Sequence, residues 1–261
     1  MSLTARDLAR VEAAEASQQR MLRLQRMSHH ELRALLSGDP TQAAVWITSA
    51  AEYGLPAAQL RLGRMLLEGH GMARNAALAI FWFRRAAEQL DAEAMNMMGR
   101  CHENGWGTQP YLCDAAHWYR QSAYRGHDWG QYNFGNMLFD GRGIEQDAAQ
   151  AQLWYLRAAR QGHSRAMNLL GRCCEEGWGC PKDMVAAFEW YRRSARAGYF
   201  RGQFNYAALL FDHGFHGEAA EWYRLAAENG TPQMRQTIAA RLFQARDPAL
   251  QAIRQRIGAP P

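Results

Sequence analysis

The fold is decided by one stretch, Leu-Gly-Arg-Met-Leu-Leu-Glu-Gly-His-Gly at residues 62–71, because this stretch returns along the chain at a fixed interval. Its first glycine, Gly63, has a counterpart every 36 residues without a slip, and an alanine takes the last position. The counterparts are Gly99, Gly135, Gly171 and Ala207. A fixed period of this size is typical of proteins that stack copies of one small unit. The sequence therefore predicts a single repeat array.

A second motif alternates with the first and predicts the other half of each unit. It reads Ala-x-x-Trp, then usually an aromatic residue, with small residues four and five positions after the tryptophan. Its tryptophans are Trp46, Trp82, Trp118, Trp154, Trp190 and Trp222. Such spacing predicts an amphipathic helix with the tryptophan in the core. Each unit is thus predicted to be a hairpin of helix A, which carries the Leu-Gly stretch, and helix B, which carries the tryptophan.

Other residues predict where helix B begins and ends. Asn75, Asp147 and Asp183 stand at its start, where their side chains can accept a hydrogen bond from a free backbone N–H. Its end is expected at a glycine in the left-handed conformation. These glycines are Gly126, Gly162, Gly198 and Gly230. The glycine within helix A has a different predicted role, because its missing side chain lets a neighbouring helix approach closely.

The array is predicted to span residues 31–230 as about six hairpins, of which the first and the last are atypical. Residues 1–30 are predicted to form a helix that either caps the array or serves as a partner-binding arm. Residues 231–261 are predicted to form two capping helices, begun by Pro232 and Pro248. The predicted fold class is an all-α solenoid of stacked antiparallel helix pairs.

Apolar runs and cysteines bear on the compartment. No stretch approaches about 18 consecutive apolar residues, and charges interrupt every apolar run within residues 1–30. We therefore expect a cytoplasmic protein whose five cysteines are reduced. Cys101 and Cys173 share a helix A position that is Met in other copies, which favours core packing, although a bond between Cys173 and Cys180 stays open. Metal-site spacing is absent, so neither a metal nor a cofactor is expected.

Charge and motif content separate the remaining classes of function. The net charge is +5, and Lys182 is the only lysine among 30 basic residues, but these residues form no basic block. A basic nucleic-acid-associated protein is an alternative that retention on heparin would support. The chain has no phosphate-binding glycine loop and no serine elbow, and Glu103 and Glu175 lie two repeats apart. We therefore expect that the chain is not an enzyme. A hydrolase-type activity in a groove of the array is the least favoured alternative.

The combined pattern resembles the Sel1-like repeat family, relatives of the tetratricopeptide repeats. The matching features are helix A with Leu-Gly, the Gly-x-Gly loop, helix B with Ala-x-x-Trp-Tyr, and Gly-His turns at 126–127 and 162–163. The resemblance covers residues from about 45 to 230. It implies a right-handed α-solenoid, a superhelix that serves as an adaptor or scaffold for protein–protein interaction, in many cases bacterial. The implied partner is another protein or a peptide, and a second copy of the chain is a further option.

The helix A glycine sets the register of the candidate binding face. The residues three before it and one after it lie four apart and share a face, expected on the concave side of the array. The candidate binding residues there are Arg64, Asn96, Arg100, Tyr132, Asn136, Asn168 and Arg172. An asparagine amide can bind a peptide backbone, and an arginine can pair with a carboxylate. The pattern resembles the polar ladder by which tetratricopeptide relatives hold a peptide.

Two loop tryptophans, Trp106 and Trp178, are further candidates. Each stands between the glycines of a Gly-x-Gly loop, where a large aromatic side chain either joins an interface or folds over its own neighbouring repeat. The copies around Arg100 and Arg172 share Asn-x-x-Gly-Arg-Cys-x-Glu-x-Gly-Trp-Gly, so the surface repeats every 72 residues while the core repeats every 36. We therefore expect a binding site between these two patches.

Overall fold

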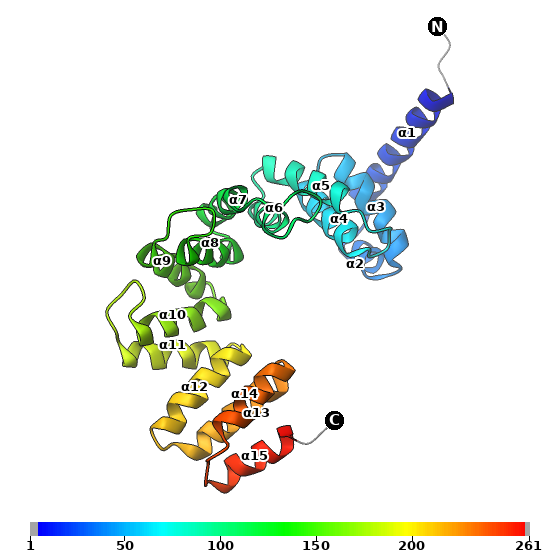
Figure 1. Cartoon of the computed structure of the whole chain (residues 1–261). Coiled ribbons are helices and arrows are strands. Elements are labelled where there is room, and N and C mark those ends of the chain that lie inside the picture. The colour runs from blue at the N-terminus through cyan, green and yellow to red at the C-terminus, as the bar shows by residue number, and fades with distance from the viewer. Residues whose placement is uncertain (1–4, 259–261) are drawn as a thin grey trace. The chain divides into compact units, whose positions relative to one another are not determined.

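The structure, a computed structural model, describes residues 5–258 of the chain. Within that range it consists of fifteen helices and no strand, so the prediction of an all-α fold is confirmed (Figure 1). The helices are α1 (Ala5–Arg26), α2 (His29–Ser37), α3 (Pro40–Glu52), α4 (Pro56–Glu68), α5 (Ala76–Glu88), α6 (Ala92–Asn104), α7 (Leu112–Tyr124), α8 (Asp128–Asp140), α9 (Ala148–Arg160), α10 (Ser164–Glu176), α11 (Met184–Arg196), α12 (Phe200–Asp212), α13 (His216–Asn229), α14 (Pro232–Arg241) and α15 (Pro248–Gly258). The outermost residues of the predicted capping segments lie outside the described range.

The chain forms two compact units, Met1–Gly130 and Gln131–Pro261, and the boundary falls within α8. In the first unit each helix from α3 to α7 packs on the next one along the chain. In the second unit the helices from α9 to α13 do the same. The even-numbered helices from α4 to α12 carry the Leu-Gly stretch or its counterpart and are the predicted helices A. The odd-numbered helices from α5 to α13 are the predicted helices B. Stacked helix pairs are therefore confirmed.

The glycine within helix A allows an aromatic ring of helix B to lie against the helix A backbone. A Cβ atom built on Gly99 would come within 2.5 Å of the Tyr119 ring, which is closer than real contacts allow. The same clash recurs at Gly63, Gly135 and Gly171 against the aromatic residue of their own repeat. The prediction that these glycines serve helix packing is confirmed.

The buried aromatic residue of each repeat is the one that follows the tryptophan. These residues are at most 1% exposed: Phe83, Tyr119, Tyr155, Tyr191 and Tyr223. Among the repeat tryptophans only Trp82 and Trp154 are buried, whereas the others are half-buried: Trp46, Trp118, Trp190 and Trp222. Trp118, Trp190 and Trp222 still pack against the buried core, so the prediction of core tryptophans is confirmed in part, although four of the six are less buried than predicted. The residue after the tryptophan is the more deeply buried one because its ring lies against the helix A glycine.

Helix ends follow the sequence with one exception. Asn75, Asp147 and Asp183 each accept a hydrogen bond from the backbone N–H three residues later, at 2.9 Å, so their role as N-caps is confirmed. The turns after three helices B contain a glycine with positive φ, as predicted: Gly126, Gly162 and Gly198. Gly230 instead has an extended conformation with φ of −93°, because α13 is followed directly by the start of α14.

The helices at either end lie against the repeats. In α1, Met21 is 5% exposed, and the Arg20 Nε donates to the Ser49 hydroxyl of α3 at 2.7 Å. In the second unit α13 packs against both α14 and α15, which follow it in orange and red (Figure 1). Ile238 and Leu250 are fully buried there. Within the described residues no helix is long and apolar enough to cross a membrane.

Candidate functional site

The predicted binding residues divide between the two units. Arg64, Asn96, Arg100 and Trp106 belong to the first unit, and the others belong to the second: Tyr132, Asn136, Asn168, Arg172 and Trp178. All but the two tryptophans lie on helices A, as the register predicted. The structure brings some of them together within each unit.

In the first unit the candidates make contacts with other residues of the same unit. Arg64 forms an ion pair with Glu93 of the next helix A. Asn96 is 5% exposed, so its amide offers little surface to a ligand. The Arg100 guanidinium lies 4.9 Å from the centre of the Trp106 ring. The basic charge of Arg64 is therefore offset inside the chain.

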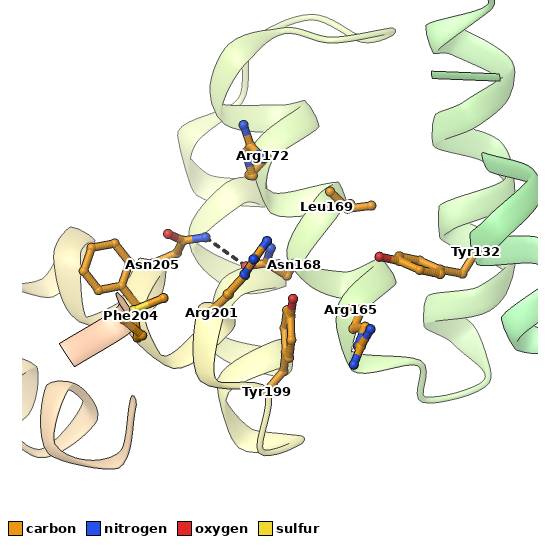
Figure 2. A pocket seen from close by; sticks show the side chains of 10 residues that line it. Tyr132, Arg165, Asn168, Leu169, Arg172, Tyr199, Arg201, Phe204 and Asn205 are labelled. Carbon is orange, nitrogen blue, oxygen red and sulfur yellow. Dashed lines mark hydrogen bonds between the residues drawn. The ribbon is translucent and has the colours of Figure 1, made fainter. Parts of the chain in front are cut away.

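In the second unit the helix A face contains a pocket of about 240 Å³. Its lining residues come from three helices A, the turn before α12, and α14: Tyr132, Arg165, Asn168, Leu169, Arg172, Tyr199, Arg201, Phe204, Asn205 and Met234. Three of them, Tyr132, Asn168 and Arg172, are predicted binding residues. Figure 2 shows the hydroxyl groups of Tyr132 and Tyr199 pointing into the same space, with Arg201 beside it.

The polar side chains of this pocket are held in place by their neighbours. Asn168 is 4% exposed, and its Oδ1 accepts a hydrogen bond from Asn205 Nδ2 at 2.8 Å, drawn as a dashed line in Figure 2. The Tyr132 ring stacks on His163, with ring centres 4.7 Å apart. Asn136 lies outside the pocket lining and accepts a hydrogen bond from the Tyr155 hydroxyl at 2.9 Å. Asn168 therefore braces two helices A and presents less of its amide than a solvated residue would.

The pocket is basic, since its lining contains three arginines and no acidic residue. Arg165 lies over the Tyr199 ring, with its guanidinium carbon 5.7 Å from the ring centre. Burial raises the pKa of the Tyr199 hydroxyl above its ordinary value, against the opposing effect of Arg201 and Arg165. The hydroxyl therefore keeps its proton and can donate a hydrogen bond to a bound group.

Two of these arginines were missed by the sequence analysis. Arg165 and Arg201 occupy one position of the repeat, six residues before the helix A glycine or its alanine counterpart. We call this the charge position, and its occupants are Ala57, Glu93, Trp129, Arg165 and Arg201. The same 36-residue register would have revealed it, because an acidic residue in the second copy becomes basic in the fourth and fifth.

The loop tryptophans fold toward their own chain. Trp178 is half-buried, with its ring centre 5.2 Å from that of Phe139 in the preceding repeat. The Arg172 guanidinium lies 4.8 Å from the centre of the same ring. The next glycine makes this fold tight, since a Cβ atom on Gly179 would lie 2.3 Å from the Ala148 carbonyl oxygen. These contacts agree with packing between repeats, and a binding role for Trp106 or Trp178 stays a prediction.

The geometry favours neither a metal site nor a reactive thiol at Cys101 or Cys173. Among the described residues no three His, Cys, Asp or Glu side chains are grouped so that they could hold a metal ion. Cys101 and Cys173 are at most 1% exposed, as their core role predicted, and burial raises the pKa of each thiol to about 12. The Cys180 thiol lies 3.5 Å from the Cys173 carbonyl oxygen, and all five cysteines are free.

A comparison with protein families gives one match. The model described as Sel1 repeat matches five segments that together cover more than half of the chain. These segments are residues 56–89, 92–127, 130–163, 164–199 and 201–231. The first matched segment begins at α4, so none of the five segments covers residues 31–55 of the predicted array. No curated protein matches the sequence significantly.

Solved structures give the same result. A protective antigen of uropathogenic Escherichia coli is 31% identical with a TM-score of 0.69, and the match covers 84% of this chain and 48% of that one. The chain thus spans about half the length of that antigen. A Sel1 repeat protein from Oxalobacter formigenes is 29% identical with a TM-score of 0.66, covering 71% of this chain and 76% of that one. An immunity protein from Pseudomonas aeruginosa, with 17% identity, a TM-score of 0.52 and 77% of each chain covered, shares the fold alone.

Proposed function

Because the chain belongs to the Sel1 repeat family, whose members generally mediate protein–protein interactions, we propose that it is a non-enzymatic scaffold whose helix A face binds a segment of another protein. The site proposed for this contact is the pocket of the second unit. The occupant that we propose is a protein segment, because Sel1 repeats generally mediate protein–protein interactions.

One observation carries this proposal. The pocket collects side chains from α8, α10 and α12, three consecutive helices A, on a single face. A ligand that contacts all three helices has to be extended along the array, as a peptide segment is. The volume of about 240 Å³ is below the roughly 300–1,000 Å³ of small-molecule pockets, so it suits an anchoring side chain of such a segment.

The contacts that hold the pocket side chains in place support binding of a partner without a large rearrangement of the pocket. Asn168 and Asn205 hold α10 and α12 together through their hydrogen bond, and the Tyr132 ring rests on His163 at the start of α10. Side chains that are already ordered lose less conformational entropy when a partner binds. Arg64, Asn96 and Arg100 form a second candidate face in the first unit, where Glu93 offsets the charge of Arg64.

Affinity capture from extracts of the native host tests the proposal, with Arg172→Glu as the variant. Arg172 is exposed and forms no ion pair among the described residues, so charge reversal removes a pocket contact without breaking a salt bridge. We expect the specifically captured protein to be lost, while circular dichroism stays that of the parent.

The matched control is Arg120→Glu, the same change at an exposed position of helix B in the first unit. This variant should capture the same protein as the parent chain. A partner that Arg172→Glu and Arg120→Glu retain equally would show that the pocket does not hold it and would refute the proposed site.

We also propose a bacterial source and a cytoplasmic setting. The structures described above come from bacteria, which supports the first part. The five free cysteines support the second part, because thiols stay reduced in the cytosol. Fractionation of host cells, with the protein recovered outside the cytoplasmic fraction as the contrary outcome, tests this setting.

A further inference from the structure

A cluster of thiols stands at the end of α10 and in the loop that follows it. Its members are Cys173, Cys174 and Cys180. Earlier repeats hold other residues at the Cys180 position, namely Met72, Thr108 and Ile144. At the Cys174 position they hold Leu66, His102 and Leu138. The fourth repeat thus carries thiols that the fold of the repeat does not require.

The backbone folds this loop back over the last turn of α10. The Trp178 amide donates to the Cys173 carbonyl oxygen at 2.9 Å. The Asp183 amide, which ends the loop, donates to the Cys174 carbonyl oxygen at 2.8 Å. The Cys180 thiol donates to the Cys173 carbonyl oxygen at 3.5 Å. Cys180 is therefore held beside the end of the helix that carries Cys174.

The Cys174 and Cys180 thiols lie within hydrogen-bonding reach of each other. Cys174 is 6% exposed and belongs to the apolar core of the second unit, while the half-buried Cys180 packs against that core. Burial raises the pKa of the Cys174 thiol to about 11, and Cys180 adds to this through charge repulsion and a hydrogen bond. Two sulfur atoms so close need only side-chain rotation to reach the roughly 2 Å separation of a disulfide.

The third thiol of the cluster is turned to another use. Cys173 is 1% exposed and takes the core position that Met65 and Met137 hold in other repeats. It meets Cys180 through its carbonyl oxygen, which accepts the hydrogen bond from the Cys180 thiol. The geometry therefore favours Cys174 over Cys173 as the partner of Cys180.

From this arrangement we infer that Cys174 and Cys180 form a reversible disulfide, which makes the loop of the fourth repeat an oxidation site. The inference goes beyond the proposed function, and its oxidant is a small disulfide of the glutathione class. The Cys180 thiolate attacks one sulfur of that disulfide and expels a small thiolate. The Cys174 thiolate then attacks the Cys180 sulfur and expels the second small thiolate. The chain loses two protons and two electrons, and the small disulfide takes them up as it becomes two thiols.

A reversible bond agrees with a cytoplasmic setting, where thiols are kept reduced and the disulfides that do form are in most cases transient or redox-sensing. Once formed, the bond ties the loop to the last turn of α10. Trp178 lies within the closed segment, and Arg172, whose guanidinium lies 4.8 Å from the Trp178 ring centre, lines the pocket. Oxidation thus restrains the loop that adjoins the pocket.

Peptide mass spectrometry of the full chain tests the inference. The folded protein is incubated with oxidised glutathione, its remaining thiols are blocked with iodoacetamide, and the chain is cut with trypsin. The segment 173–182 is released as one peptide that contains the three cysteines, because it lies between Arg172 and the bond after Lys182. We expect this peptide to carry an internal disulfide and one blocked thiol. Treatment with a dithiol before blocking should return it with all its thiols blocked.

The variants take residues that other repeats hold at the same positions, so each should fold like the parent chain by circular dichroism. Cys174→Leu and Cys180→Thr should each lower the yield of bridged peptide by about tenfold or more, since each removes one of the two sulfurs. Cys173→Met is the matched control, because it removes the neighbouring thiol and should leave the yield unchanged.

Three results would overturn the inference. Bridging that survives Cys174→Leu and is lost in Cys173→Met would assign the bond to Cys173. Cys180 that stays bound to glutathione without bridging would show that Cys174 does not reach it. Bridging that appears only in urea would show that the folded loop does not form the bond. The capture experiment with Arg172→Glu is made under reducing conditions, so the proposed function stands or fails independently of this bond.

Discussion

At the scale of single residues, Leu90 is the one position outside glycine with positive φ among the described residues. It follows α5 at the place where later repeats have Gly126 and Gly162, and its φ is 67°. A left-handed conformation costs a residue with a side chain about 1–2 kcal/mol. Its side chain is 62% exposed, so few contacts repay that cost. Leu90 is therefore a strained residue at a position where glycine would fit better.

Replacing Leu90 by Gly should stabilise the protein by up to about 1 kcal/mol, since the relief of strain exceeds the entropy that glycine adds to the unfolded chain. Urea unfolding measures the free energy directly. The control is Leu153→Gly, at a 56% exposed position within α9, which should destabilise by about 1 kcal/mol. Equal losses for both variants would show that Leu90 is not strained.

A second residue-scale feature is a buried histidine. His102 in α6 is 7% exposed, and no described group hydrogen-bonds its Nδ1 atom, which lies 3.6 Å from the Asp114 carboxylate. Burial lowers the pKa of His102 below 6.5, and Arg84 adds to this, while Asp114 opposes it. The folded protein thus binds the proton less readily than the unfolded chain. Stability is therefore lost as the pH falls through about 6.5 toward the folded pKa.

His102→Leu should remove that loss. Leu66 and Leu138 occupy the equivalent position of other repeats, so the substitution fits the packing. We expect a gain of about 1 kcal/mol at pH 7 from removing an unpaired buried polar atom, and a larger gain at pH 5. Urea unfolding at the two pH values measures it.

The control for this prediction is His117→Leu, at an exposed position of α7, which should change the free energy by no more than about 0.5 kcal/mol. A gain for His102→Leu that is the same at pH 5 and pH 7 would contradict the proton-linked explanation.

At the scale of elements, the Gly-x-Gly loop ties each helix A to the repeat before it. Trp178 packs on Phe139, and the backbone at Gly179 comes close to the first residue of α9. The loop is thus part of the stacking contact as well as a connection. A half-buried tryptophan in such a place contributes to the free energy of unfolding whether or not a partner also touches it.

Trp178→Ala should destabilise the protein by about 2 kcal/mol, less than the 3–5 kcal/mol of a fully buried tryptophan. Thermal and urea unfolding test this, with Val185→Ala at an 81% exposed position of α11 as a variant that should behave like the parent. An unchanged unfolding curve for Trp178→Ala would instead favour the reading of this tryptophan as an interface residue.

The helices were predictable from sequence because their signals are local. The caps at Asn75, Asp147 and Asp183 and the glycine of helix A depend on neighbouring residues or on one close helix pair. The sequence alone could not show which of Trp118 and Tyr119 is the more deeply buried residue, because the two lie on overlapping faces of one helix. Packing against the backbone at Gly99 decides it in favour of Tyr119.

At the scale of the whole molecule, the site was predicted only in part. The register found Tyr132, Asn168 and Arg172, because each lies on the helix A face near its glycine. It did not reveal that Asn168 is buried, since the covering contact with Asn205 comes from the next repeat. It also did not reveal the Arg64–Glu93 ion pair, which joins two helices. Contacts between repeats, unlike helix ends, are properties of the assembled array.

The charge position has a consequence for how such a protein changes over generations. Its side chains lie on the surface, whereas the glycine and tyrosine six and twenty-six residues further on form the core, as Arg165, Gly171 and Tyr191 show. When a gene segment encoding one whole repeat is copied, the core contacts are inherited intact. A single later codon change at the charge position can then turn an internally balanced repeat into a basic one. Core packing and surface charge can therefore change independently of each other in this chain.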